Sequence, residues 1–284
     1  MTTVTVDGMT FGDGLPWVLT DLGGWLDGPP VRGQKIDRPV DHGGFAIPAL
    51  RGGRVVTVEA YVEGSSPADV GEVSDQLSGV LADGEFGELT VTRNDGQTTS
   101  ASVQIDAAPM VGWFPHVNAV AAQLQFYAPD PLRYGPTQNL TTTFPELVGG
   151  LEFDLFTDGA GTDVGWLDFG EAGSSGRVTV DNPGTAPATP QFQVSGPIPS
   201  FEIVHVETGA RLTFSRALSA DEVLLIDSAT GLVALGDAAV DYSGYLTRAE
   251  WFSIPRKGSA TIAFVPLGAD GTGSLTVIHR AAWW

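Results

Sequence analysis

The side chains that most often carry out chemistry are sparse in this sequence. The four histidines, His42, His116, His205 and His279, lie far apart, and no two have the spacing of a helix-borne metal site. None accompanies a Gly-x-Ser-x-Gly nucleophile turn, and His205 and His279 fall in strand patterns as ordinary strand residues. The chain has no cysteine, which excludes a thiolate zinc site, an iron–sulfur cluster and a cysteine nucleophile.

Carboxylates are the one abundant reactive group, with 34 Asp and Glu against 14 Lys and Arg. A pair of carboxylates about 5–9 Å apart is all that a glycoside hydrolase needs. Asp158, Asp163 and Asp168 offer the oxygen ligands that Ca²⁺ prefers, but no D-x-D-x-D-G loop is present. A P-loop and a strand–GxGxxG–helix unit are also missing. We predict no catalytic residue, no cofactor and no metal ligand, and keep a glycoside hydrolase as a remote alternative.

Aromatic residues are the remaining candidates for a contact surface. VGWFPHVN places Trp113 and Phe114 beside a proline, and Trp283 and Trp284 are adjacent. Because apolar area costs roughly 25 cal/mol per Å² in water, we expect the last pair to fold back onto the chain or to enter a neighbouring subunit. Aromatic rings in the loops of a β-sandwich also stack on sugars. A carbohydrate-binding protein for host cell-wall glycans is therefore the main alternative, with these platforms: Trp113, Trp166 and Trp251.

The formal charge of −20 limits the partners of the chain. Affinity for phosphates comes mainly from Lys and Arg, so the chain should be repelled by bare nucleic acid and by anionic membranes. No apolar run approaches the ~20 residues of a membrane span. The start, MTTVTVDGMTF, has neither a basic flank nor an apolar core, so we expect synthesis and folding in a cytoplasm.

Most of the elements that must position these residues are predicted to be short strands, so the fold class is mainly β. Glycine (37) and proline (19) separate runs that alternate with period two. Arg93–Gly96 is a predicted hairpin turn. The second-half runs recur every 8–15 residues or so, which fits a β-sandwich. The runs are VTVDG, VVTVEAYVEG, ELTVTRNDG, SASVQID and AAQLQFYA, then RVTVDN, QFQVSG, FEIVHVE, ARLTFS, EVLLIDS, LVALG, TIAFVP and SLTVIHR.

One segment, from Ser65 to Gly84, predicts a helix. Ser66 can cap it, Pro67 suits its first turn, and Gly84 can stop it. Its apolar residues share one face and should pack on the sheets: Val70, Val73, Leu77, Val80 and Leu81.

The stretch FYAPDPLRYG (Phe126–Gly135) predicts a rigid corner. Proline fixes φ and has no N–H, so Pro129 and Pro131 cannot extend a strand ladder. We expect Arg133 or Tyr134 to pin this corner and the corner to join two domains, 1–135 and 136–284. PTQNLTTTFPELVGG reads as a crossover, and a Gly/Asp-rich excursion follows at 154–176.

The order of several segments resembles the distal tail and minor tail proteins of long-tailed bacteriophages (siphophages). FYAPDPLRYG resembles the corner that ends their N-terminal half, and RGGRVVTVEAYVEG resembles their strand before the helix. The stretch from Asp181 to Ser215 (DNPGTAPATPQFQVSGPIPSFEIVHVETGARLTFS) is similar to their C-terminal signature, and Leu218–Glu222 resembles the step before an apolar strand. The likeness spans most of the chain, and the 154–176 excursion departs from the pattern.

This resemblance implies a structural virion protein of the tail tip, made in the host cytoplasm. The first domain, a β-sandwich or split-barrel-like module with one helix, would form a homohexameric hub ring. A galectin-like β-sandwich would follow. The implied partners are the tail tube protein, the tape-measure protein, the tail-associated hub protein, receptor-binding or adhesin components and a host surface glycan. The acidic composition adds the expectation that DNA passes through the ring without binding.

Overall fold

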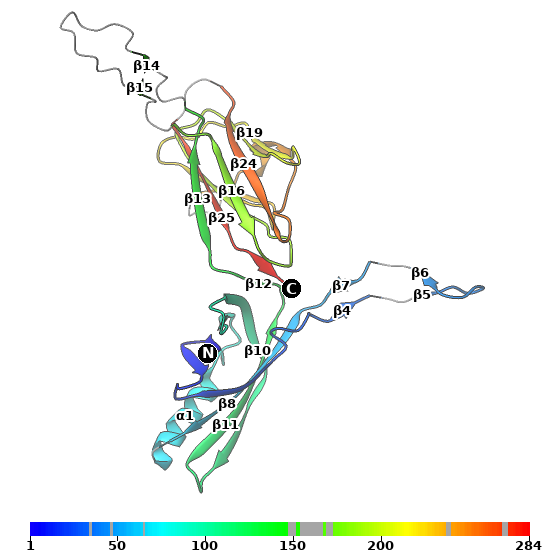
Figure 1. The fold of residues 1–284 in the computed structure, drawn as a ribbon, viewed down its shortest axis with the longest axis vertical. Coiled ribbons are helices and arrows are strands. Elements are labelled where there is room, and N and C mark those ends of the chain that lie inside the picture. The colour runs from blue at the N-terminus through cyan, green and yellow to red at the C-terminus, as the bar shows by residue number, and fades with distance from the viewer. Residues whose placement is uncertain are drawn as a thin grey trace, which may run out of the picture. The chain divides into compact units, whose positions relative to one another are not determined.

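The computed structural model describes residues 1–33, 36–45, 48–64, 66–146, 152–153, 167–168, 173–236, 240–268 and 272–284. The chain is mainly β, with one α-helix and several antiparallel sheets, which confirms the predicted fold class. It divides into two compact units (Figure 1). Unit 1 comprises Met1–Pro136 and Trp283–Trp284, and unit 2 comprises Thr137–Ala282.

Unit 1 is built on a nine-stranded antiparallel sheet in the order β2-β1-β9-β10-β11-β8-β3, with β12 and β26 attached. The long strand β10 pairs with β9 through Thr98–Val103 and with β11 through Gln104–Phe114, with register shifts between Ile105 and Met110. The bounds are β1 Thr3–Val6, β2 Met9–Gly12, β3 Val18–Gly23, β8 Arg54–Glu63, β9 Gly87–Thr92, β10 Thr98–Phe114, β11 Ala119–Ala128, β12 Arg133–Tyr134 and β26 Ala282–Trp283.

The alternating sequence explains the two faces of this sheet. In β8 and β11 every second side chain is buried, and these include Val56, Val58, Leu124 and Phe126. Their alternate neighbours point to the other face, as the period of a strand requires. The predicted hairpin is present between β9 and β10, where Gly96 has a φ of 83° and Arg93 N donates to the Gln97 carbonyl.

The predicted helix is present as α1 (Pro67–Gly79), capped by the Ser66 side chain, which accepts from Asp69 N at 3.3 Å. Val70, Leu77 and Val80 are buried in the unit 1 core, against β10 and β11. The helix ends at Gly79 rather than near Gly84. The Asp7 carboxylate accepts from Leu81 N at 3.1 Å, and Leu81 takes a φ of 47°, so the chain has already left the helical conformation there.

Two further ladders of unit 1 form an arm, defined here as Pro30–Arg51. They pair β4 (Val31–Arg32) with β7 (Leu50–Arg51) and β5 (Ile36–Asp37) with β6 (Gly44–Phe45). In Figure 1 this ribbon runs away from the sheet of unit 1. Every residue of the arm that the structure describes is exposed.

Unit 2 is a β-sandwich of two antiparallel sheets, ordered β13-β25-β17-β20-β21-β22 and β16-β24-β18-β19-β23. The two sheets share one core rich in phenylalanine. The bounds are β13 Gln138–Thr143, β16 Arg177–Asn182, β17 Gln191–Ser195, β18 Phe201–His205, β19 Arg211–Phe214, β20 Val223–Asp227, β21 Leu232–Leu235, β22 Val240–Asp241, η1 Ser243–Tyr245, β23 Leu246–Ala249, β24 Gly258–Pro266 and β25 Ser274–His279. A separate pair joins β14 (Glu152–Phe153) to β15 (Leu167–Asp168).

The stretch read as a crossover, PTQNLTTTFPELVGG, instead contains β13, an outer strand of the six-stranded sheet. Its threonines are β-branched and pair along β25, with Thr141 Oγ1 2.9 Å from Thr276 Oγ1. Phe144 just after the strand is buried and stacks on Phe264, with ring centroids 4.3 Å apart. The polar composition of β13 did not indicate a strand, although its inward-facing Thr142 is buried.

Candidate assembly surface

Unit 1 contains a four-stranded layer that ends in two open edges. It consists of β3, β8, β11 and the second half of β10, from Gln104 to Phe114. Within the described chain, β3 pairs only with β8, and this half of β10 pairs only with β11. A strand edge carries unpaired N–H and C=O groups, so each edge can accept another strand.

Apolar side chains gather along the open part of β10 and the turn after it. Met110 is 67% exposed, Trp113 59%, Phe114 53% and Val117 66%. An exposed, hydrophobic edge strand of this kind is a site for pairing with another chain. Of the aromatics singled out from the sequence, Trp113 and Phe114 thus lie together on one exposed hairpin.

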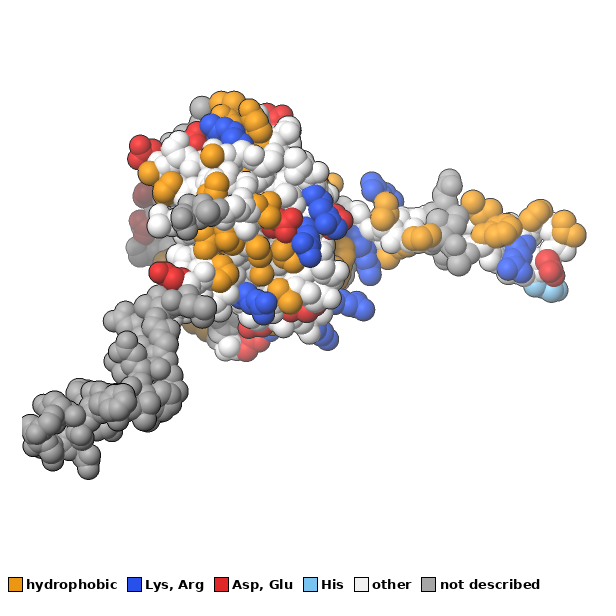
Figure 2. Space-filling model, turned by 90° about the horizontal axis from the view of Figure 1, so that it is seen from above, with side chains coloured by type: hydrophobic (Ala, Val, Ile, Leu, Met, Phe, Trp, Pro, Cys, Tyr) orange, Lys and Arg blue, Asp and Glu red, His pale blue; other side chains and the backbone are white. Residues whose placement is uncertain are grey.

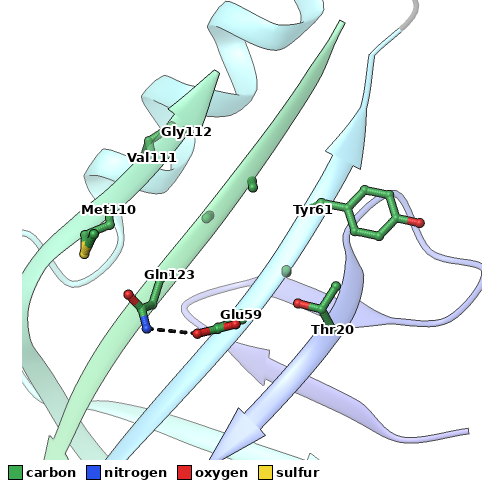
Figure 3. A pocket seen from close by; sticks show the side chains of 10 residues that line it. Thr20, Glu59, Tyr61, Met110, Val111, Gly112 and Gln123 are labelled. Atoms are coloured by element: carbon green, nitrogen blue, oxygen red, sulfur yellow. Dashed lines mark hydrogen bonds between the residues drawn. The ribbon is translucent and has the colours of Figure 1, made fainter. Parts of the chain in front are cut away.

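The outer face of the four-stranded layer holds a shallow groove of about 500 Å³. Side chains from all four strands line it, and Figure 3 shows how they lie: Thr20 of β3, Glu59 and Tyr61 of β8, Gln123 of β11 and Met110 and Val111 of β10. Gln123 Nε2 donates to Glu59 Oε1 at 3.0 Å. The lining is mostly apolar and contains a single carboxylate and no histidine. This composition suits a contact surface and provides no acid–base pair.

The proline corner at 129–131 is held by a buried arginine. Arg54, the first residue of β8, pairs with Ala128 at the end of β11 and is 1% exposed. Its Nε and Nη2 both lie 3.2 Å from the Pro131 carbonyl oxygen. Its Nη1 reaches the carbonyls of Gly24, Trp25 and Asp27 at 2.6, 2.9 and 2.6 Å. One guanidinium therefore joins the corner to the loop after β3.

The two residues expected to pin the corner make other contacts. Tyr134 donates its hydroxyl to Asp130 Oδ2 at 2.6 Å, which closes the corner on itself. Arg133 is 8% exposed, donates from Nη2 to the Trp284 carbonyl and lies 5.8 Å from the centre of the Trp25 ring. Both residues form β12, which pairs with β10 at Ser100. The corner therefore lies inside unit 1, ahead of the unit boundary at Pro136.

Burial lowers the pKa of both guanidiniums, and the charge of Arg54 also acts on Arg133. Burial lowers the pKa of Arg133 to about 10, and the nearby positive charge of Arg54 contributes in the same direction. Burial also lowers the pKa of Arg54, while Asp27 partly restores it. Both groups remain protonated at neutral pH. The acceptors described for them are backbone carbonyls.

Sequence reasoning overlooked Arg54, although a signal for it was present. The buried residues of β8 are Val56, Val58, Ala60 and Val62, and Arg54 has the same parity. An arginine in register with the inward positions of a strand must either break the pattern or find acceptors inside the protein. Here it finds four carbonyls.

The other predicted residues are dispersed. Trp251 of unit 2 is 40% exposed, and its ring lies against the turn at Gly231. Trp283 is half-buried in β26, which pairs with β12, and Trp284 is 37% exposed. Trp166, Asp158 and Asp163 lie outside the described residues, as does most of the 154–176 excursion. Asp168 is in β15.

The described histidines include one that contacts a carboxylate: His205 Nδ1 lies 3.2 Å from Glu207 Oε2. His205 and His279 are both buried at the ends of strands, and His279 Nε2 lies 3.1 Å from the Asp181 carbonyl oxygen. Among the described residues, no three His, Cys, Asp or Glu side chains are grouped to hold a metal ion. No helix in that same part of the chain has the length and apolar character needed to cross a membrane.

The motif DNPGT has a structural role in unit 2. Asn182 is fully buried, and its Nδ2 donates to the Ala186 carbonyl at 2.8 Å. Its Oδ1 accepts from Gly184 N at 3.1 Å and from Ala282 N at 3.3 Å. Gly184 is required because a Cβ there would lie 1.9 Å from the Ala282 carbonyl oxygen. The asparagine thus fastens the turn to Ala282, the first residue of β26.

The architecture is that of a two-unit, mainly β protein, and solved structures share it. The Dit protein of phage SPP1, described as a paradigm of the hub adsorption apparatus in phages that infect Gram-positive bacteria, matches with a TM-score of 0.69 and 14% identity over 100% of both chains. A chain of the phage P2 baseplate in its activated conformation with Ca matches with a TM-score of 0.53 and 10% identity, over 98% of both chains.

A chain of the same baseplate with Sr gives a TM-score of 0.50 and 9% identity, over 97% of this chain and 98% of that one. No protein-family model matches the sequence, and no curated protein matches it. At identities this low, the likeness establishes a common fold that extends over both units.

Proposed function

We propose that this protein is a structural component of a bacteriophage tail tip, in which copies of unit 1 join to form a hub ring. The observation that carries the proposal is the four-stranded layer with two uncovered edges and an exposed apolar hairpin. The similarity in fold between the whole chain and a phage hub protein supports the same role. The role is structural, and the groove composition favours binding over turnover.

The two edges of this layer differ, which favours a ring over a simple pair. If β10 of one copy pairs with β3 of the next, the contact is heterologous, and repeated rotation closes it into a ring. Each contact would also cover the exposed side chains of Trp113 and Phe114. Six copies is the number that the resemblance to distal tail proteins implies.

The proposed partners follow from the place of such a ring. The tail tube, the tape-measure end, the tail-associated hub protein and receptor-binding components would contact its faces. Unit 2 would lie on the outside, where its exposed Trp251 could contact a host glycan. Because the chain carries a formal charge of −20, carboxylates on the channel wall would repel passing DNA at short range.

Native mass spectrometry of the full chain over a range of concentrations tests this proposal. The expected result is a closed oligomer of defined copy number, centred on six, with ring-shaped particles by electron microscopy. A single-copy mass at every concentration, both alone and mixed with the tail tube protein, would contradict it. Purified tail tubes should bind this chain but not an unrelated acidic β-sandwich protein, which serves as the control. That result would support a place in the tail.

A further inference from the structure

The arm is a two-stranded ribbon without the support that such a ribbon needs. A two-stranded hairpin is only marginally stable in water by itself. Five large apolar side chains on this arm are nevertheless exposed, by 47–95%: Val31, Ile36, Val40, Phe45 and Leu50. Figure 2 shows apolar and basic side chains together along the described parts of the arm. Exposed apolar residues at this density mark an interaction surface.

The charge of the arm is opposite to that of the rest of unit 1. The arm has four basic residues, Arg32, Lys35, Arg38 and Arg51, against Asp37 and Asp41. The remainder of unit 1 has 15 acidic and 3 basic residues. Two of those three, Arg54 and Arg133, are buried. The outer surface of unit 1 beyond the arm is thus strongly acidic, and it would attract the arm of another copy.

The groove on the outer face of the four-stranded layer has matching chemistry. Its lining is mostly apolar, with Tyr61, Met110 and Val111 at least 36% exposed. Its only charged lining residue is Glu59, and Asp21 is exposed on the adjacent strand β3. An apolar, basic ribbon fits an apolar groove with acidic side chains on one side.

We propose that the arm of one copy docks along the outer face of the four-stranded layer of a second copy, with its apolar side chains in the groove lined by Glu59, Tyr61 and Met110. The inference rests on the proposed self-association of unit 1 and specifies one of its contacts. It is separate from the edge pairing described above, because it uses the face of the layer and leaves both edges free.

The absence of cysteine makes a clean crosslinking test feasible. Chains carrying Val40→Cys, at the arm tip, are mixed with chains carrying Met110→Cys, in the groove, and treated with a short bismaleimide. The matched control replaces Met110→Cys by Phe86→Cys, because Phe86 is equally apolar and 59% exposed but lies outside the groove. The expected result is an inter-chain product at least about fivefold above the control, which weakens as salt screens the charges.

A charge-reversed arm, Arg32→Glu with Arg38→Glu, should lower this product, whereas Arg177→Glu with Arg256→Glu in unit 2 changes the net charge equally and should not. Native mass spectra of the same samples separate the two proposals. An oligomer without the Val40–Met110 product overturns the docking and leaves the ring proposal standing. Absence of both the oligomer and the product overturns both. A product formed only within one chain, in a variant that carries both cysteines, overturns the docking onto a second copy.

Discussion

Unit 1 and unit 2 have nearly the same length and the same formal charge, yet their surfaces differ. Each holds 17 acidic and 7 basic residues. Among the residues that the structure describes, however, 16 of the 22 exposed large hydrophobic side chains belong to unit 1. Net charge therefore does not distinguish the units, and the placement of apolar surface does.

The difference reflects how each unit completes its core. Unit 2 closes two sheets on one another, with fully buried phenylalanines such as Phe201 and Phe264 between them. Unit 1 covers one face of its sheet with α1, but leaves a layer with open edges and an arm with exposed apolar residues. Unit 1 therefore exposes more apolar surface of the kind that partners cover, and unit 2 buries most of its own.

The largest effect is expected from Phe264→Ala in unit 2. This ring is fully buried, stacks on Phe144 and lies 5.6 Å from Phe201, centroid to centroid. Its removal should lower the free energy of unfolding of unit 2 by about 3–5 kcal/mol. Calorimetry should show two unfolding transitions, one of which moves to a lower temperature while the temperature of the other is unchanged. If both transitions moved together, the units would not be independent and the comparison would fail.

Arg54→Met in unit 1 should have the next largest effect. The substitution keeps the aliphatic part of the side chain but removes the guanidinium. The carbonyls of Gly24, Trp25, Asp27 and Pro131 are then left without their donor. We expect a loss of about 3 kcal/mol, confined to the transition that Phe264→Ala leaves unchanged. Arg51→Met is the control, because Arg51 is exposed and its Nη1 donates to the Pro29 carbonyl at 3.0 Å. A similar loss in both variants would mean that burial of Arg54 is not what matters.

The apolar hairpin should affect association more than stability. Trp113→Ser with Phe114→Ser should weaken self-association about tenfold, or about 1.4 kcal/mol, and leave both thermal transitions nearly in place. Trp251→Ser in unit 2 is the matched control, since its ring is also partly exposed. Sedimentation velocity over a concentration series measures the change. If self-association weakened equally in both variants, the contact would involve both units, and unit 1 would not be the main site of association.

The smallest effect concerns pH and the buried His279 of unit 2. Burial lowers the pKa of His279, and the hydrogen bond to the Asp181 carbonyl only partly opposes this. The unfolded chain therefore binds a proton near pH 6.5 while the folded chain does not, so this contribution to stability is lost as the pH falls below about 6.5. His279→Gln should reduce the slope of unit 2 stability against pH between about 7 and 5. An unchanged slope would show that this histidine is not protonated on unfolding.

Much of the fold could be predicted because local chemistry and the final environment agree. The alternation of VVTVEAYVEG and AAQLQFYA is the alternation of buried and exposed positions in β8 and β11. The Ser66 cap marks the start of α1 as predicted. The end of α1 could not be read locally, because Asp7, more than seventy residues away, supplies the acceptor for Leu81 N.

The surfaces of unit 1 were harder to predict. The strands of the arm are two residues long, too short for any periodicity, and RGQKIDRPVDHGG looks like an ordinary polar loop. The open edges of β3 and β10 depend on which strands fail to pair, which is a property of the whole sheet. The proline corner was visible in Pro129 and Pro131, but the residue that fixes it, Arg54, lies 77 positions away from Pro131.

The return of Trp283 and Trp284 to unit 1 has a consequence for the order in which the chain is made. A ribosome adds about 5–20 residues per second, so roughly 7–30 s separate Pro136 from Trp283 and Trp284. During that interval β12 lacks its neighbour β26, and Arg133 lacks the Trp284 carbonyl. A nascent chain therefore cannot complete unit 1 before unit 2 has been translated. Any surface that depends on the complete unit 1 is delayed until Trp283 and Trp284 have been added.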